Sequence, residues 1–160
     1  MPPITAILHT HNDERRLGRA LQTLYACDEI LIVDHGSSDQ TRRVARDYSA
    51  RFLTTPIAGS PGGYLLQARC DWVLCLLPSE AVSEALEASL LEWRHRRSSE
   101  LLGVTSGSVA VREETAEGWT EAESVTRLVP KSWKEWDGVL PRPSPEALQL
   151  TGALLRFLLP

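Results

Sequence analysis

The sequence contains few cysteines, no long apolar run and no stripe of basic residues, and each absence excludes a class of protein. The three cysteines, Cys27, Cys70 and Cys75, are an odd number at spacings that match no zinc or disulfide framework. We therefore expect reduced thiols in the core of a cytoplasmic protein. No uncharged apolar run approaches the roughly 20 residues of a membrane span, and the first residues lack the basic start and apolar stretch of a signal peptide. The sequence predicts neither a secreted nor a membrane-spanning chain.

The charge of the chain excludes a nucleic-acid partner. The net charge is −4 and the isoelectric point is near 5.6, with basic residues scattered apart from one short run at 94–97. Nothing here forms the basic stripe that a phosphodiester backbone needs. The chain has 160 residues, 42% of them hydrophobic and 24% charged, which is the balance of a globular protein with a real core. We expect one domain over residues 1–160, divided into a first half, 1–100, and a second half, 101–160.

The first half alternates strand and helix patterns. Short apolar or β-branched runs predict strands at 4–9, 29–34, 51–55 and 71–77. Helical patterns follow them at 17–24, from Ser37 or Ser38 as N-cap to about Tyr48, at 64–70, and from Ser79 to 97. Alternation of this kind predicts an α/β fold with a mostly parallel sheet.

The second half has a different pattern. Alternating residues predict antiparallel strands at 101–114 and 124–130, joined by an acidic hairpin or loop. A connector containing Trp133 and Trp136 follows, and we expect these rings to pack under the sheet. The sequence then predicts a last helix, opened by Ser144 and Glu146, that docks on the sheet or across a dimer interface.

Polar clusters fall where three of the predicted parallel strands end. They read "HTHNDE", "DHGSSD" and "PSE". Ligands of open α/β sheets bind beyond the carboxyl ends of the strands. The pattern therefore predicts one shared site at this edge.

The residues around the first two clusters resemble a known family. The sequence motif is kept at Thr10, Asn12, Asp34, Gly36, Ser37, Asp39 and Thr41, and "CDWVLCLLPSE" continues it. Over roughly the first 85 residues the chain resembles family 2 glycosyltransferases of the GT-A fold, by several spaced elements that agree. A weaker likeness to lipopolysaccharide-core transferases lies in 127–129, 136–139 and 152–156, where the family's His-Glu pair and later His are missing. The resemblance implies a nucleotide-diphospho-sugar-transferase three-layer sandwich with a mostly parallel twisted sheet, here with a shortened second half.

The resemblance also implies a nucleotide site. The residues that it assigns to nucleotide binding are Thr10, His11, Asn12, Asp13, Asp34 and Asp39. His11 replaces the tyrosine on which the family's base often rests. For Asp39, together with Ser37 and Ser38, a purely structural role at the start of a helix is the alternative.

The family's metal-binding Asp-Ala-Asp is replaced by Leu77, Pro78 and Ser79, and Glu80 alone remains. Mg²⁺ or Mn²⁺ is therefore implied only if the chain is active, and Glu80 has the alternative role of an acid at a helix N-terminus. His9, His11 and His35 are weak candidates for a His/carboxylate metal site or a pH-responsive anion pocket, with solvated loop-edge residues as the alternative.

These observations predict a nucleotide-sugar-binding fold that lacks efficient catalysis. One alternative is an active glycosyltransferase with a non-standard or metal-independent site. A carboxylate of the acidic loop, Glu113, Glu114 or Glu117, folded beside Glu80 would favour it. The second alternative is a non-catalytic partner-binding or regulatory protein, whose partner is another protein or a second copy of itself. The base, the sugar, the acceptor and a general base are not predicted.

Overall fold

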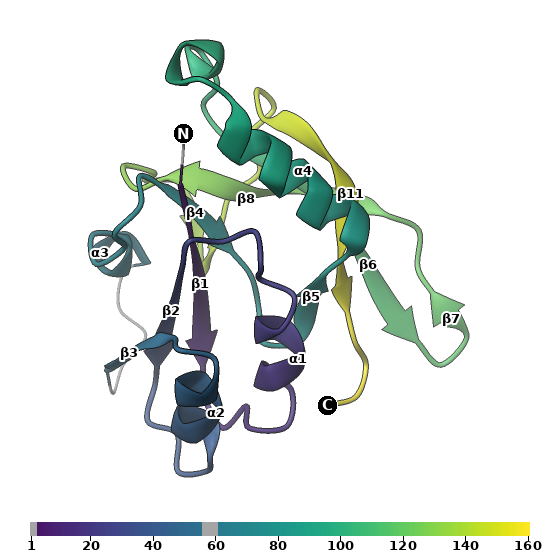
Figure 1. Cartoon of the computed structure of the whole chain (residues 1–160). Helices are drawn as coiled ribbons and strands as arrows, with labels where there is room; N and C mark the ends of the chain where they lie inside the picture. Colours follow the sequence, from purple (N-terminus) through teal and green to yellow (C-terminus); the bar gives the residue numbers. More distant parts are fainter. Residues whose placement is uncertain (1–2, 56–60) are drawn as a thin grey trace.

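One curled sheet organises the protein (Figure 1), which we describe from a computed structural model covering residues 3–55 and 61–160. The strand order is β3-β2-β1-β4-β8-β6-β11-β5, with β7 paired to β6. The first four strands of this order are parallel to one another. Their bounds are β1 Ile4–Thr10, β2 Glu29–Asp34, β3 Arg51–Thr54 and β4 Trp72–Cys75. The parallel half is thus built from the four strands expected from the sequence.

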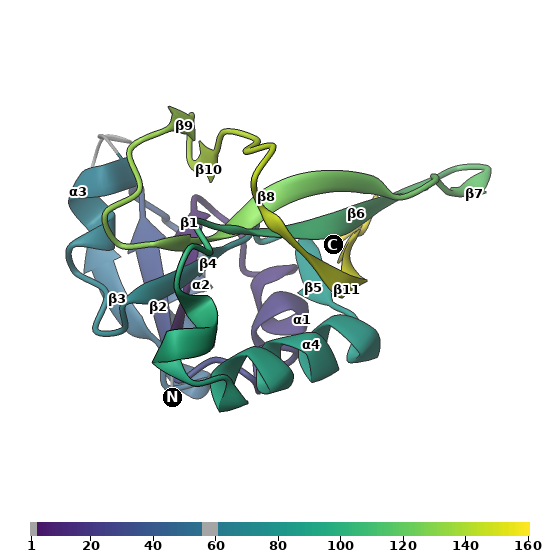
Figure 2. The ribbon, with the colours of Figure 1, turned by 90° about the horizontal axis from the view of Figure 1, so that it is seen from above.

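The other half of the sheet is mixed. Strand β8 is antiparallel to β4 and β6, β11 is parallel to β6, and β5 is antiparallel to β11. The strands are β5 Glu80–Val82, β6 Gly107–Thr115, β7 Gly118–Trp119, β8 Glu123–Pro130 and β11 Leu148–Arg156. A small separate ribbon pairs β9 Trp136–Asp137 with β10 Leu140–Pro141. The expected antiparallel strands and the acidic hairpin are confirmed, and the hairpin projects from the sheet (Figure 2).

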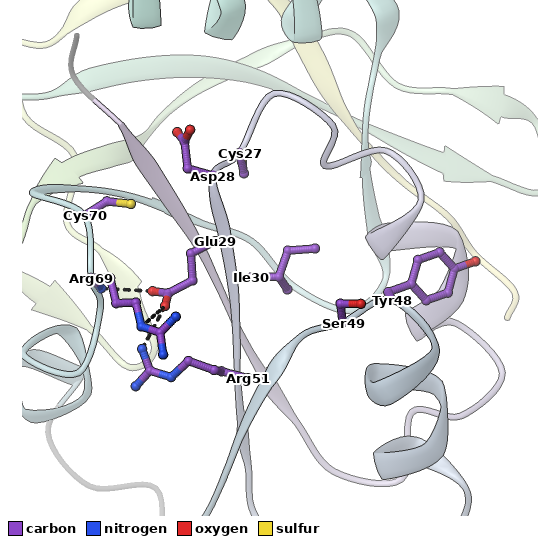
Figure 3. Close-up of a pocket in the computed structure, with 9 residues that line it drawn as sticks. All are labelled: Cys27, Asp28, Glu29, Ile30, Tyr48, Ser49, Arg51, Arg69 and Cys70. Carbon is purple, nitrogen blue, oxygen red and sulfur yellow. Dashed lines mark hydrogen bonds and ion pairs between the residues drawn. The ribbon is translucent and has the colours of Figure 1, made fainter.

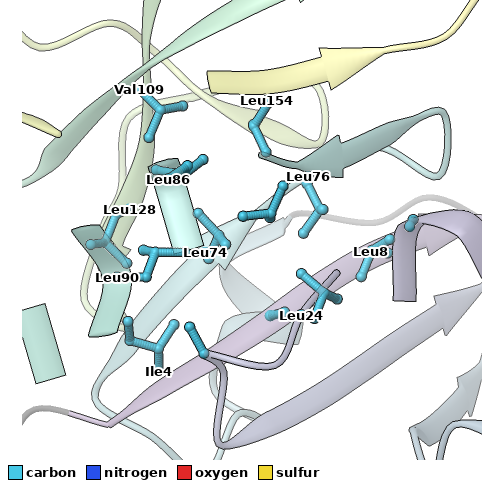
Figure 4. Packing of buried hydrophobic residues seen from close by; sticks show 14 of the residues in the cluster. Ile4, Leu8, Leu24, Leu74, Leu76, Leu86, Leu90, Val109, Leu128 and Leu154 are labelled. Carbon is cyan, nitrogen blue, oxygen red and sulfur yellow. The ribbon is translucent and has the colours of Figure 1, made fainter. Parts of the chain in front are cut away.

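Helices and loops cover both faces of the sheet, which gives three layers. Helices α1 Leu17–Leu21, α2 Thr41–Asp47 and α4 Glu84–His95 supply side chains to the larger core. Figure 4 shows Leu86 and Leu90 of α4 packed among side chains of the strands in this core. Helix α3 Pro61–Leu65 and the connector with Trp133 and Trp136 pack on the smaller core of the opposite face. A 3₁₀ turn, Ser98–Leu101, follows α4. The α/β sandwich with a mostly parallel sheet is confirmed.

The predicted last helix is wrong, because this segment is the strand β11. The period of Leu148, Leu155 and Leu158 suits a helix, but the chain instead adds to β6 in parallel register, from Leu148 against Gly107 to Arg156 against Glu113. Gly152, at φ +94°, lies in the register shift between Gln149 and Ala153. Tertiary pairing has overridden a short local pattern.

Three other local predictions need correction. Residues 80–82 form β5, so α4 begins later than expected, with Ser83 as its N-cap accepting a hydrogen bond from the Leu86 N–H at 3.2 Å. Helix α2 has no serine cap, since its N-cap is Gln40. Helix α3, Pro61–Leu65, overlaps the expected span of 64–70 only at residues 64–65. The sequence also predicts a Gly/Pro-rich loop at 56–63, of which 56–60 lies outside the described residues. Within them, no helix has the length and apolar character to cross a membrane.

We expect Gly152→Ala to destabilise the fold by about 3 kcal/mol or more, because it combines steric overlap with backbone strain. A Cβ at this position would lie 2.1 Å from the backbone N of Leu86. The measurement is the free energy of unfolding in urea. Gly63→Ala is the control, since nothing lies within 4 Å of its added Cβ. If Gly152→Ala lowered the free energy of unfolding by no more than Gly63→Ala does, the close approach of β11 and α4 would be contradicted.

Candidate functional site

Asp34 fastens the loop after β2 to the end of β1. Its carboxylate is 3% exposed and accepts hydrogen bonds from Thr10 Oγ1 at 2.7 Å, Ser37 Oγ at 2.5 Å and Ser37 N–H at 2.9 Å. Burial raises the pKa of Asp34, but these hydrogen bonds outweigh it and leave the pKa below its ordinary value. Asp34 is therefore an ionised structural anchor, and its partners come from both loops.

Asp39 joins the same two loops one turn further on. It accepts hydrogen bonds from the Thr41 N–H at 2.9 Å, Thr41 Oγ1 at 2.5 Å and the Glu14 N–H at 3.1 Å. Thr41 Oγ1 in turn accepts from the Asp13 N–H at 2.9 Å. Burial raises the pKa of Asp39, and these donors lower it below its ordinary value. The structural role proposed for Asp39 at the start of α2 is observed, with Asp39 rather than a serine holding the Thr41 N–H.

Asn12 and Asp13 complete the β1–α1 loop. Asn12 has a left-handed backbone, φ 54°, and its N–H donates to Ser37 Oγ at 2.8 Å while its Oδ1 accepts from the Ser38 N–H at 2.8 Å. Asp13 accepts from the His11 N–H at 2.8 Å. The six residues assigned to nucleotide binding thus meet at one edge. Asp34 and Thr10 are buried within it, whereas His11 and Asn12 are exposed.

His9 and His35 form a hydrogen-bonded pair at the ends of β1 and β2. His9 Nδ1 lies 2.9 Å from His35 Nε2, and the rings are nearly parallel, with centroids 5.1 Å apart. This separation is that of rings lying edge to edge and joined through their nitrogens. Tyr64 meets both rings edge-on. Because the two nitrogens face one another, the pair shares one proton.

The surroundings of His35 select a tautomer. Its Nδ1 is buried without a hydrogen-bond partner among the described residues. A bare lone pair there costs less than an N–H without an acceptor. We therefore place the shared proton on His35 Nε2, so that His9 accepts it at Nδ1 and carries its own proton on Nε2.

The predicted histidine metal site is not assembled. His11 Nδ1 lies 2.9 Å from the His35 carbonyl, so it is the donor there, and the facing nitrogens of His9 and His35 are occupied by each other. In the described part of the chain, no three His, Cys, Asp or Glu side chains converge on a metal position. These histidines line the loop edge instead.

Glu80 is neither a metal ligand nor a helix cap, which corrects both roles considered for it. Its side chain is fully buried on β5 and lies between two arginines. Arg127 Nη1 and Nη2 donate to its two oxygens at 2.7 and 2.9 Å, and Arg156 Nη2 and Nε donate to Oε1 at 2.8 and 3.2 Å. The Leu77 N–H donates to Oε2 at 3.0 Å. Burial raises the pKa of Glu80, but the Arg127 guanidinium and the other donors hold it below its ordinary value.

A divalent cation does not fit the turn that follows β4. Leu77, Pro78 and Ser79 bring no carboxylate, and both oxygens of Glu80 already accept charge-assisted hydrogen bonds. Sequence reasoning missed Arg127 and Arg156. Arg127 is flanked by uncharged residues in the middle of β8, and Arg156 is the single charged residue of β11. A charge in such a strand is the signal for a buried ion pair.

One residue of the acidic hairpin reaches this network. Glu113 Oε2 lies 3.6 Å from Arg156 Nη1, and the Glu113 side chain is 54% exposed. Its backbone is fixed by Thr120, whose N–H donates to the Glu113 carbonyl at 2.8 Å. The Glu113 carboxylate of the hairpin is therefore linked to Glu80 through the Arg156 guanidinium.

A pocket of about 370 Å³ lies at the opposite, amino-terminal edge of the sheet (Figure 3). Its Glu29 carboxylate accepts from Arg51 Nη1 at 2.8 Å and from the Arg69 N–H at 2.9 Å. Cys27 and Cys70 also line it, and both are free thiols. No motif residue of the carboxyl edge contributes to this pocket.

Known proteins similar to this chain are glycosyltransferases. The chain is 30% identical over 129 residues to the lipopolysaccharide core biosynthesis glycosyltransferase LpsC of Rhizobium meliloti, covering 69% of this chain and 48% of that protein. It is 31% identical over 91 residues to an uncharacterized glycosyltransferase of Rickettsia typhi, covering 54% of this chain and 31% of that protein. The chain therefore spans between 31% and 48% of the length of these relatives. No family model matches the sequence.

A solved structure supports the fold. TarS of S. aureus, residues 1–349, superposes with a TM-score of 0.58 at 16% identity, over 82% of this chain and 48% of that one. The fold is that of GT-A glycosyltransferases, and the glycosyltransferase resemblance read from the sequence is confirmed.

We expect Glu80→Gln to lower the free energy of unfolding by about 3–5 kcal/mol, because it leaves a buried guanidinium without its counter-charge. The folded-state pKa of Glu80 is lowered, so its stabilisation is present above the ordinary glutamate pKa and is lost as the pH falls below it. Urea unfolding at pH 7 and at acid pH measures both effects. Glu113→Gln, an exposed partner of the same network, is the control and should change stability by less than about 0.5 kcal/mol. An acid slope equal in wild type and Glu80→Gln would contradict the assignment.

We expect the His9 ring to stay neutral down to a pKa of about 4, because burial and the neighbouring His35 disfavour its charged form. Since this pKa is below that of an unfolded histidine, stability should fall as the pH drops from about 6.5. Nitrogen-detected NMR would follow the titration and should show Nε2 protonated on both rings of the neutral pair. Exposed His95 on α4 is the reference ring, and a Nδ1 proton on His35 would contradict the tautomer.

Proposed function

We propose that this chain is a family 2-like glycosyltransferase domain that binds a nucleoside diphosphate, or its sugar, without a divalent cation, and that transfers sugar inefficiently. The observation that carries the proposal is the contrast between the two parts of the carboxyl edge. The two loops that would hold a nucleotide are joined to each other by hydrogen bonds. At the turn that would hold a metal, the one carboxylate is paired with arginines instead.

The nucleotide part is supported by the exposed residues of the β1–α1 loop. His11 offers an imidazole on which a base can stack, and its Nδ1 bond to the His35 carbonyl fixes the ring. Asn12 is held in a left-handed conformation beside it. Thr10, Asp34 and Asp39 act through the loops by positioning them, and Asp13 fixes the His11 N–H. All three cysteines are free thiols, which suits a cytoplasmic protein.

Inefficient transfer follows from the donor set of the turn. A departing diphosphate develops negative charge that a bound metal neutralises, and loss of that assistance costs several kcal/mol of transition-state stabilisation. The oxygens of Glu80 are committed to Arg127 and Arg156, so no metal ligand remains there. We therefore expect the chain to bind a nucleotide but to transfer sugar inefficiently.

The second candidate is a metal-independent transferase, and Glu113 favours it. This exposed carboxylate of the acidic hairpin lies beside Arg156, which contacts Glu80. Such a carboxylate is a candidate to accept a proton from an acceptor hydroxyl. A purely partner-binding protein has less support, because Trp133 and Trp136 are half-buried against the sheet.

The test is a thermal-shift panel of UDP, GDP, CDP and their sugars, each with Mn²⁺ and with EDTA. We expect one base to stabilise the protein equally in both conditions, by about 2.7 kcal/mol at 100 times its dissociation constant. His11→Ala should reduce this shift, and His95→Ala, which removes an exposed imidazole from α4, should not. A shift that needs Mn²⁺, or sugar transfer at ordinary enzymatic turnover, would overturn the proposal, as would the absence of any shift.

A further inference from the structure

Arg156 carries positive charge at the carboxyl edge that Glu80 does not neutralise. Glu80 supplies one negative charge to two guanidinium groups, and Arg127 takes both of its oxygens in a buried, two-pronged contact. Arg156 shares Oε1 only, and its side chain is 30% exposed. The Arg127–Glu80–Arg156 cluster therefore has a net charge of +1, located on its exposed arginine.

The Nη1 atom of Arg156 has N–H donors that form no hydrogen bond with the described residues. Within the described part of the chain, Nη1 is approached by the Glu113 carboxylate at 3.6 Å, beyond hydrogen-bond distance. Charge-assisted hydrogen bonds of arginine are typically about 2.7–2.9 Å long. Glu113 is therefore a loose, solvent-screened counter-ion that an anion with better geometry can displace.

Arg156 also lies on the correct edge of the sheet. The Glu80 that it contacts closes the turn after β4, where the Leu76 N–H donates to the Ile7 carbonyl of β1 at 3.3 Å. The residue after Arg156, Phe157, donates its N–H to the Ser79 carbonyl at 3.0 Å, and Arg19 of α1 lies 3.9 Å over its ring. Figure 1 likewise shows the end of the chain beside α1. The guanidinium thus lies at the turn after β4, and β4 is the neighbour of β1 in the sheet.

We propose that Arg156 is a binding residue for the diphosphate of the nucleotide, and that Glu113 competes with the ligand for it. A guanidinium recognises phosphate oxygens through two parallel N–H donors and keeps its charge at any working pH. This inference rests on the proposed function and names the group that meets the phosphates in the absence of a metal.

The test compares dissociation constants for UDP, GDP and CDP, their nucleosides and inorganic pyrophosphate, by calorimetry in EDTA. We expect Arg156→Gln to weaken the diphosphates and pyrophosphate about tenfold or more, and to leave nucleosides unchanged. Arg156→Lys should retain part of the affinity as a point charge. Glu113→Gln should tighten diphosphate binding about threefold at low salt, because it removes a competing charge.

The matched control is Arg94→Gln. Arg94 is 28% exposed and pairs with Asp28, whose side chain accepts the Ile4 N–H at the other edge of the sheet, so it should have no effect. Unfolding curves establish that the variants fold. If Arg156→Gln does not fold, the test uses Arg156→Lys and Glu113→Gln instead. A Glu113→Gln variant that binds diphosphates as weakly as wild type, or more weakly, overturns the inference.

The two proposals fail in different ways. In one outcome, nucleosides bind, and the diphosphates bind more tightly than the nucleosides by the same factor in wild type and in the Arg156 variants. This result would overturn the role of Arg156 and leave the proposed function standing. If no nucleoside or nucleotide binds, the proposed function fails, and the pyrophosphate measurement decides the inference. Pyrophosphate binding that depends on Arg156 supports an anion site there, and pyrophosphate that fails to bind, or binds Arg156→Gln equally, overturns it.

Discussion

The contact of Glu80 with Arg127 and Arg156 joins three strands of the mixed half of the sheet and reaches the end of β4 in the parallel half. Glu80 lies on β5, Arg127 on β8 and Arg156 on β11, and Arg127 Nη1 also donates to the Cys75 carbonyl at the end of β4. A buried ion pair adds little net stability, because desolvation offsets attraction. Removing one partner is costly, however, so the contact fixes where these strands end relative to one another. The shape of the carboxyl edge depends on it.

The same contact changes the chemistry of that edge. A turn with free carboxylates presents negative charge and attracts a divalent cation. Here Leu77 and Ser79 are neutral, and Glu80 lies between two guanidinium groups, of which Arg156 is partly exposed and has Glu113 as a second, loose counter-ion. Loss of metal ligands is thus coupled to the gain of an exposed guanidinium at this edge. A phosphate-binding surface is compatible with this change, whereas a cation-binding surface is not.

Sequence reasoning succeeded where local and tertiary preferences agree. The first four strands were predictable because each is an apolar run between turn signals, and the motif residues were placed at their shared edge. Residues 148–156 were not, because nine residues with a helical leucine spacing also fit a strand, and the choice is made by pairing with β6, about 40 residues earlier. The role of Glu80 could not be predicted for the same reason. Its neighbours suggest a helix start, but its partners lie 47 and 76 residues away.

The direction of the site side chains was equally out of reach of the sequence, and it determines how the edge can work. The acids that the motif identifies turn inward, where Asp34 and Asp39 accept hydrogen bonds from both loops. These bonds join protein groups to one another, so forming them requires no ligand atom. Pre-ordering removes a cost that a flexible site meets when it binds. If the proposed function holds, a nucleotide would need neither a metal nor a closing motion to order these loops. Its affinity would then depend on its contacts with His11, Asn12 and Arg156.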